Sequence, residues 1–177
     1  SLSGGVSYQD VGNLRVGGGD ELPFSGFTGR AGDAKLIWKP VENQELMLQV
    51  QTLTQPRTPR HDELVPGFGQ TRPNSAVFYF EPQARDFAQL RWTLNSATPA
   101  FDGLAVHLGW QQIQDDRRTR DFGSVNEDRE RNSSDLVGLT AQFNKALGAH
   151  YLTYGVEIYQ DQVDSFRERT NTNTGAV

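Results

Sequence analysis

Apolar and polar residues alternate along most of this chain with the two-residue period of a β-strand whose faces meet different surroundings. The clearest segment begins at Glu45, where Leu46, Leu48 and Val50 share one parity and glutamines occupy positions of the other. The same pattern predicts an all-β chain of about seven strands, with no convincing helix. The expected strands cover approximately 6–16, 34–39, 45–52, 78–94, 104–111, 137–143 and 151–159. Pro82 interrupts the fourth of these strands without shifting its phase, so we expect Phe78 and Phe80 to face the same side of the sheet as Leu90.

The connections between these strands alternate in length. Short ones are expected at 40–44, 95–103 and 144–149, and long polar loops at 55–75 and 114–134, with a further polar run at 167–174. Short turns at one rim and long loops at the other are typical of outer-membrane β-barrels, with the turns in the periplasm. The first strand should then rise from the periplasmic side.

Parity also assigns the two faces of the predicted barrel wall. The apolar parity should face lipid, and the polar parity should face the water-filled interior, where we place Gln89, Arg91 and Gln111. Aromatic belts mark the membrane interfaces of barrels, although strands are rich in aromatic residues in any case. The expected interface aromatics are Trp38, Trp92, Trp110, Phe143 and Tyr151, with Phe80 and Tyr159 toward the long-loop ends.

Composition narrows the function further. The 177 residues carry a net charge of −5, which gives no electrostatic reason to expect a nucleic-acid partner. The absence of cysteine excludes disulfides, thiolate zinc sites and cysteine nucleophiles. The mean hydropathy of −0.61 suits a barrel, because only one face of each strand has to be apolar.

A shared strand pattern, without a short diagnostic motif, runs through residues 6–19, 22–27, 34–38, 45–48 and 56–64. In this pattern these segments resemble the first barrel strands and first long loop of the TonB-dependent outer-membrane receptor family.

This resemblance implies a barrel of about 22 strands closed around an N-terminal plug, driven through the TonB complex. Neither the plug nor the motif that contacts TonB is found in these residues, so residues 1–177 are expected to be a partial barrel domain. The implied function is uptake of an iron complex across the bacterial outer membrane. A ferric siderophore is favoured over haem, while cobalamin or a glycan remains open. Membrane lipid and lipopolysaccharide are expected around the wall.

Candidate ligand-binding residues lie in the two predicted long loops. The first loop offers Arg57, Arg60 and His61, which could line a ligand vestibule. The second offers three arginines, which could contact an anionic siderophore or lipopolysaccharide phosphates; they are Arg117, Arg118 and Arg120. The alternative is a hydrated, salt-bridged loop.

The residues show no catalytic arrangement, cofactor motif or metal-ligand spacing, so we expect neither an enzyme nor a resident cofactor or metal. Two other classes stay open. A soluble β-sandwich that binds carbohydrate or protein would pack its apolar strand faces into a core. A small complete barrel with a structural or adhesive role would need an even number of strands and termini at the same rim.

Overall fold

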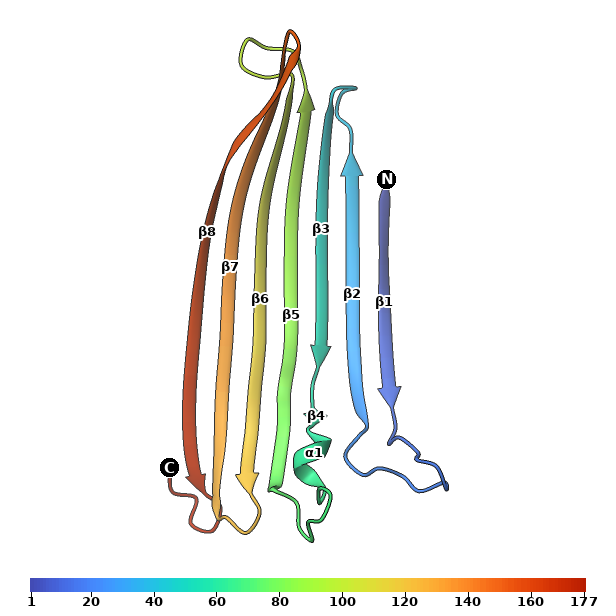
Figure 1. Cartoon of the computed structure of the whole chain (residues 1–177), viewed down its shortest axis with the longest axis vertical. Helices are drawn as coiled ribbons and strands as arrows, with labels where there is room; N and C mark the ends of the chain where they lie inside the picture. The colour runs from blue at the N-terminus through green and yellow to red at the C-terminus, as the bar shows by residue number, and fades with distance from the viewer.

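The computed structural model covers residues 1–177 and contains one antiparallel sheet (Figure 1). The order across the sheet is β1-β2-β3-β5-β6-β7-β8, and the short β4 pairs with β5. A four-residue helix, α1 (His61–Leu64), follows β4. No helix is long and apolar enough to cross a membrane. The strands are β1 (Leu2–Val11), β2 (Phe27–Trp38), β3 (Gln44–Gln55), β4 (Thr58–Pro59), β5 (Ser75–Asn95), β6 (Gly103–Asp121), β7 (Asn126–Leu147) and β8 (His150–Asn171).

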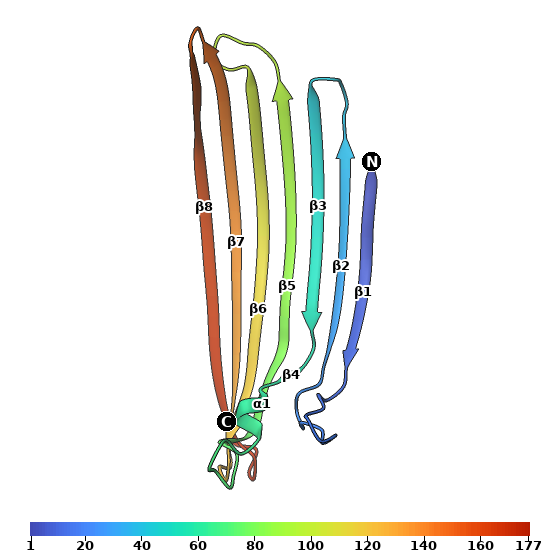
Figure 2. The ribbon, with the colours of Figure 1, turned by 45° about the vertical axis from the view of Figure 1, so that its right-hand side comes forward.

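Each long strand pairs with its neighbours in sequence, so the chain runs up and down across the sheet (Figures 1 and 2). The connections 39–43, 96–102 and 148–149 lie at one end, which is also the end where the chain starts. The connections 12–26, 56–74 and 122–125 lie at the other. This arrangement confirms the all-β, up-and-down architecture predicted from the alternation.

The sheet is a single layer without a hydrophobic core. Only 4 of the 177 residues are buried, and Leu64 of α1 is the one hydrophobic core residue. Leu36, Leu48 and Leu108 are 44%, 45% and 48% exposed, so the apolar faces are not stacked on a second sheet as a β-sandwich requires. β1 and β8 are the two edges and do not pair, so this sheet does not close into a small barrel.

The strand register aligns the apolar residues into continuous rows on one face. Residues directly opposite each other on paired strands point to the same side of a sheet. The central row crosses all seven long strands and consists of Leu2, Leu36, Leu48, Leu90, Leu108, Leu139 and Ile158. We call this side the apolar face and the opposite side the mixed face.

Three further rows extend the central one into an apolar belt. The row on the long-loop side includes Val50, Trp110 and Val137, and the two toward the short turns include Trp92 with Val106, and Leu104 with Phe143. Four rows two residues apart span about 20 Å of strand from the first row to the last. At the usual tilt of barrel strands this is about 15 Å of height between the outer rows, which lies within the apolar band, about 25 Å tall, of outer-membrane barrels.

The belt ends abruptly on the long-loop side. The next row on the same face is polar, with Thr52, Asp86, Gln112, Asp135 and Gln162. Beyond this row four strands continue as a charged extension, formed by residues 75–85 of β5, 113–121 of β6, 126–134 of β7 and 163–171 of β8. β5–β8 are therefore much longer than a membrane crossing needs.

The prediction of a long loop at 114–134 is wrong. β6 runs to Asp121 and β7 begins at Asn126, so only residues 122–125 form a turn. The polar run at 167–174 likewise contains the end of β8. These segments are strands because opposite charges meet across the register, as Arg117 and Glu130 do, which supports strand pairing without an apolar face.

Two strand details also differ from the expectation. β1 ends at Val11, and the expected strand residues Leu14 and Val16 belong instead to a small hairpin closed by a bridge between Arg15 and Glu21. The phase of β5 does shift near Pro82. Phe80 pairs with Arg117 while Gln83 pairs with Asp115, so three steps on β5 match two on β6. This bulge turns Phe78 and Phe80 to the mixed face, opposite to Leu90.

Candidate functional site

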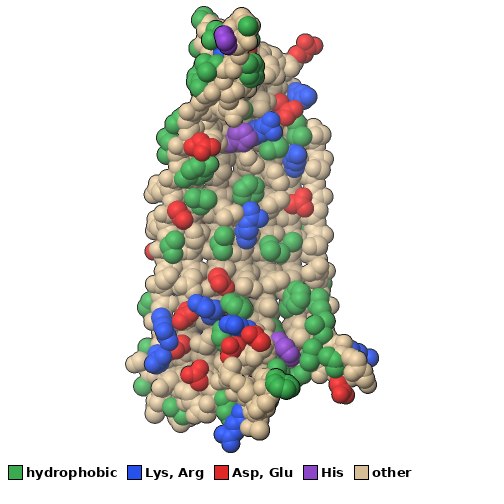
Figure 3. Space-filling model, viewed as in Figure 1, with side chains coloured by type: hydrophobic (Ala, Val, Ile, Leu, Met, Phe, Trp, Pro, Cys, Tyr) green, Lys and Arg blue, Asp and Glu red, His purple; other side chains and the backbone are tan.

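The mixed face of the belt carries the polar residues expected to line the barrel interior. Gln89, Arg91 and Gln111 all lie there, out of phase with the leucine row. Gln89 Nε2 is 3.1 Å from His107 Nδ1, and Arg85 Nε donates to Gln111 Oε1 at 2.8 Å. Figure 3 shows this face, with histidine and both signs of charge scattered along the middle of the sheet. The arrangement can form hydrogen bonds with water, a ligand or a packed domain.

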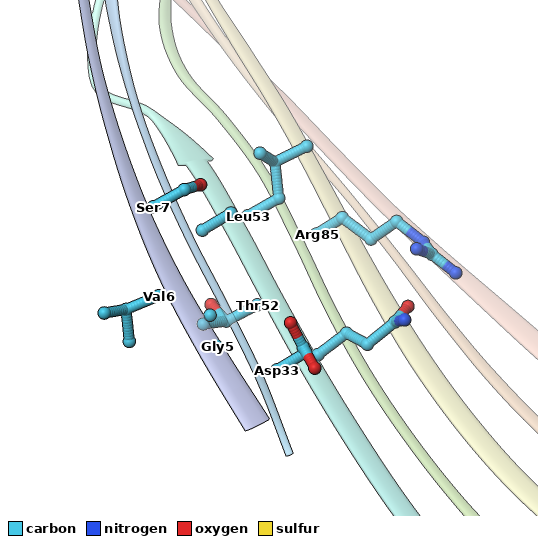
Figure 4. A pocket seen from close by; sticks show the side chains of 10 residues that line it. Gly5, Val6, Ser7, Asp33, Thr52, Leu53 and Arg85 are labelled. Atoms are coloured by element: carbon cyan, nitrogen blue, oxygen red, sulfur yellow. The ribbon is translucent and has the colours of Figure 1, made fainter. Parts of the chain in front are cut away.

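Small residues hollow out the mixed face near its β1 edge. Gly5, Ala31 and Gly32 belong to the lining of a cavity of about 310 Å³. The charged side chains of Asp33 and Arg85 also line it, and Figure 4 shows them on the side of the sheet opposite to Val6. A polar group of a packed partner could enter this hollow.

A second hollow, of about 290 Å³, lies between β5 and β8. Its lining includes Gly109 and Gly138, which are directly opposite each other on β6 and β7. The ring of Tyr159 covers Gly138 so closely that a Cβ there would lie 2.6 Å from ring carbons. Tyr159 therefore lies on the mixed face.

The first long loop places its candidates at the mouth of the sheet. His61 Nδ1 lies 2.8 Å from the carbonyl oxygen of Pro23, so it joins this loop to the 12–26 loop. The Arg60 guanidinium pairs with Asp62 at 3.2 Å and lies 5.0 Å from the Phe78 ring centroid. Arg57 pairs with Glu81 at 2.8 Å and lies 3.8 Å from the ring centroid of Tyr79. All three contact neighbouring residues, while the side chains of Arg57 and Arg60 remain 54% and 43% exposed.

The β6–β7 hairpin divides the other predicted arginines between the two faces. Arg117 lies on the mixed face and pairs with Glu130 at 2.9 Å. Arg118 and Arg120 lie on the apolar-face side and share Glu127, at 2.5 and 4.0 Å. The hydrogen bond with Glu127 raises the pKa of Arg118 above its ordinary value. The sequence candidates therefore do not form one site.

On the mixed face, Arg117 belongs to a ladder of ion pairs across β6, β7 and β8. Arg167 pairs with Glu130 and with Asp128, and Arg169 pairs with Asp128 at 2.6 Å. The hydrogen bonds from Arg169 and Arg167 lower the pKa of Asp128 to about 2. The sequence interpretation missed these partners because it treated 114–134 as a loop. The basic run at 117–120, followed by a mainly acidic run at 127–130, is the signal that could have revealed them.

The expected interface aromatics mostly lie on the apolar face. Trp38 and Trp92 share one row, Trp110 lies at the other margin of the belt, and Phe143 lies in the row nearest the short turns. Tyr151 pairs with Ala146 and lies on the mixed face, so its place at the interface stays a prediction. Tyr154 lies on the apolar face of β8, because it is four residues from Ile158, which belongs to the central leucine row.

The 96–102 connection folds against this aromatic margin. The Phe143 and Tyr154 rings stack with centroids 5.1 Å apart, and Phe101 lies 5.6 Å from Phe143. Lys145 Nζ pairs with Asp102 at 2.7 Å. The backbone N–H of Ala146 and the Lys145 ammonium together lower the pKa of Asp102. The connection is thus anchored by both rings and charge, as expected at a membrane interface.

Comparisons with known proteins identify the fold. No protein-family model matches the chain, and no curated protein matches it. Among solved structures, the copper transporter OprC superposes with a TM-score of 0.73 over 98% of this chain, at 13% sequence identity. The chain spans about a quarter of the length of OprC, since the match covers 25% of that chain. The apolar belt, the up-and-down order and this likeness together define a segment of a larger outer-membrane β-barrel.

Proposed function

We propose that this chain forms part of the wall of a TonB-dependent transporter in the bacterial outer membrane. The observation that carries the proposal is the apolar belt, which crosses all seven long strands on one face and is opposed by a mixed face. The likeness to OprC, a transporter by name, supports the same class. Energy would come from the TonB complex through a plug region. The wall itself would carry out no enzymatic reaction.

The proposed ligand is an anionic metal complex, with a ferric siderophore preferred. The mouth of the mixed face combines aromatic rings with cations, since Phe78 and Phe80 lie 6.0 Å apart beside Arg60 and Arg117. Guanidinium groups bind carboxylates and other oxygen anions and also lie over flat rings. Ferric complexes of catecholate ligands present both negative charge and aromatic rings, so they fit this chemistry.

A copper ion is the second candidate, because OprC is named as a copper transporter. Met47 and His107, which are soft and borderline copper ligands, lie in one row of the mixed face with Arg91 between them. No cluster of three or more His, Asp or Glu side chains that could hold a metal ion occurs in the chain. Haem is the third candidate and belongs to the iron class.

The test is uptake by cells that express the full-length protein as their sole receptor for the compound supplied. Ferric catecholates labelled with radioactive iron should accumulate only when TonB is present. Replacing Arg60 and Arg117 by glutamine should lower uptake about tenfold at limiting ligand. The matched control replaces Arg57 and Arg118, which lie on the other side of the sheet, and should leave uptake unchanged. Accumulation of copper without iron would identify the second candidate, and uptake independent of TonB would refute the transport proposal.

A further inference from the structure

Two arginines on the apolar-face side of the charged extension have no ionic partner. β6, β7 and β8 together contain seven arginines, and five of them lie within 4.0 Å of a carboxylate. The exceptions are Arg129 and Arg131, whose side chains are exposed on β7. They are an even number of residues from Val137 and Leu139, so they point to the same side of β7 as these two belt residues. Two free guanidinium groups therefore face the surroundings of the barrel and not its interior.

These arginines line a polar cavity of about 280 Å³. None of its seven lining residues is hydrophobic, and four are arginines, namely Arg117, Arg118, Arg129 and Arg131. A cavity of this size accommodates a phosphate group with part of a sugar. Paired guanidinium groups are the side chains best suited to bind phosphate, because their N–H groups form two parallel hydrogen bonds.

The carboxylates of this cavity are already engaged by other groups. Asp116 accepts hydrogen bonds from the Asn132 backbone N–H at 3.1 Å and from Gln114 at 2.9 Å. Glu81 pairs with Arg57, and Glu130 pairs with Arg117 on the mixed face. Their negative charges are therefore partly compensated before any ligand arrives.

Two more carboxylates lie nearby on this side: Glu127 pairs with Arg118, which leaves Glu168 as the unpaired one. It lies opposite Arg129 in the register of β7 and β8 but forms no ion pair with it. An external anion would have to compete with the Glu168 carboxylate for the Arg129 guanidinium.

The height of the cavity above the belt indicates what the anion is. Arg131 and Arg129 are six and eight residues beyond Val137 along β7. At about 3.4 Å per residue and a strand tilt of about 40°, they lie roughly 15–20 Å above the apolar belt. On β5–β8 the nearer rows of the same side contain no arginine or lysine and include Asp86, Asp135 and Asp164. On these four strands the first level with unpaired positive charge is thus well outside the hydrocarbon and beyond the lipid head group. Arg30 of β2, which is also exposed and forms no ion pair, lies one row nearer to the belt, in the row of Asp164.

We propose that Arg129 and Arg131, with Arg118 beside them, bind a phosphate group of the core oligosaccharide of lipopolysaccharide. This inference rests on the outer-membrane orientation in the proposed function, in which the charged extension faces outward. In the outer leaflet, phosphorylated core sugars are the anions that surround a barrel at this height. The site holds the barrel to its lipid neighbours and takes no part in moving the transported ligand.

The experiment measures binding of purified lipopolysaccharide to the full-length protein in detergent. One probe carries a phosphorylated core, and the second is truncated to lipid A and its first sugars. The Arg129→Gln/Arg131→Gln variant should bind the phosphorylated probe about tenfold more weakly than the unaltered protein. Both proteins should bind the truncated probe equally, and the difference should shrink at high salt.

The matched control is Arg167→Gln/Arg169→Gln, which removes the same charge at the same height from the mixed face. It should bind the phosphorylated probe as the unaltered protein does. Glu168→Gln, which removes the competing carboxylate, should bind that probe about two- to threefold more tightly. This gain keeps the proposal testable if the double variant fails to fold.

Equal binding of the phosphorylated probe by the unaltered protein and the Arg129/Arg131 variant would overturn the proposal. So would an equal loss with the truncated probe, which would place the contact at lipid A. Failure of metal-complex uptake would refute the proposed ligand without affecting this binding result. The two proposals therefore fail separately.

Discussion

The apolar belt and the charged extension are built from the same strands but are stabilised in different ways. In the belt, rows such as Leu90, Leu108 and Leu139 leave apolar side chains exposed on one face, where hydrocarbon would surround them. In the extension the same parity carries Arg118, Arg129 and Glu127, and cross-strand ion pairs take the place of apolar contacts. The solvent that a strand meets therefore changes along its length, while its backbone pairing continues without interruption.

The mixed face shows a parallel change. Within the belt it is hydrogen-bonded, as in the contact of Gln89 with His107, and at the border with the extension Arg85 donates to Gln111. In the extension it becomes an ion-pair ladder centred on Asp128 and Glu130. Fixed charges are costly near hydrocarbon but inexpensive in water, so the ladder can form only beyond the belt.

The largest effect is expected for a charge placed in the middle of the belt. Leu108→Arg should destabilise the barrel by about 2–4 kcal/mol, because its guanidinium would have to lie in hydrocarbon. Gln111→Arg, on the mixed face of the same strand, should cost less than about 1 kcal/mol. Urea unfolding of the full-length protein in phospholipid vesicles measures both. Equal costs for the two variants would contradict the assignment of the faces.

The ion-pair ladder should make the extension sensitive to acid. Asp128→Asn removes the partner of Arg169 and one of the two partners of Arg167, and should cost about 1 kcal/mol. The pKa of Asp128 is lowered from 3.8 to about 2, so its contribution is complete above pH 4 and is lost as the pH falls toward 2. Hydrogen exchange of β7 and β8 between pH 5 and 2 measures this loss. The asparagine variant should lack this part of the pH dependence, and an unchanged profile would argue against the ladder.

A steric change should show how closely the mixed face is packed. Gly138→Ala would place a Cβ 2.6 Å from ring carbons of Tyr159, so the ring must move, at a cost of about 1 kcal/mol. Adding Tyr159→Ala should remove most of the penalty that Gly138→Ala causes. Unfolding of the two single variants and the double variant gives the coupling energy. Independent, additive effects would show that the ring does not rest on Gly138.

The smallest effect is expected for the unpaired arginines. Arg129→Gln should change the free energy of unfolding by less than about 0.5 kcal/mol, because no ion pair is lost. Arg118→Gln breaks a pair with Glu127 and should cost about 0.5–1 kcal/mol. Unfolding in the same vesicles compares them. A larger cost for Arg129 than for Arg118 would show that Arg129 has a structural partner within the barrel.

The features of the fold that could be predicted are those that depend on residues close together in the sequence. The parity of Leu46, Leu48 and Val50 marks a half-apolar strand whatever its neighbours are, because successive side chains point to opposite faces. The short turns were predictable for the same reason, since they fall where the alternation stops. The bulge at Pro82 was not, because a register shift depends on how β5 pairs with β6.

The candidate site was predictable only as a set of residue types. Arg117 and Arg118 are adjacent in sequence, yet they face opposite sides of the sheet and have different partners, Glu130 and Glu127. The charge-rich stretch resembled a loop because strand propensity is low for such residues. Its pairing is visible only when the carboxylates of β7 are aligned with it.

The sequence by itself determined the strand period, the face that is apolar and the rim that carries the long loops, because these depend on near neighbours along the chain. The tertiary structure decided the length of β5–β8, the division of the arginines between two faces and the fit of Tyr159 on Gly138. Each of these depends on strand register, which sets which distant residues lie opposite one another and is fixed only when the sheet is assembled.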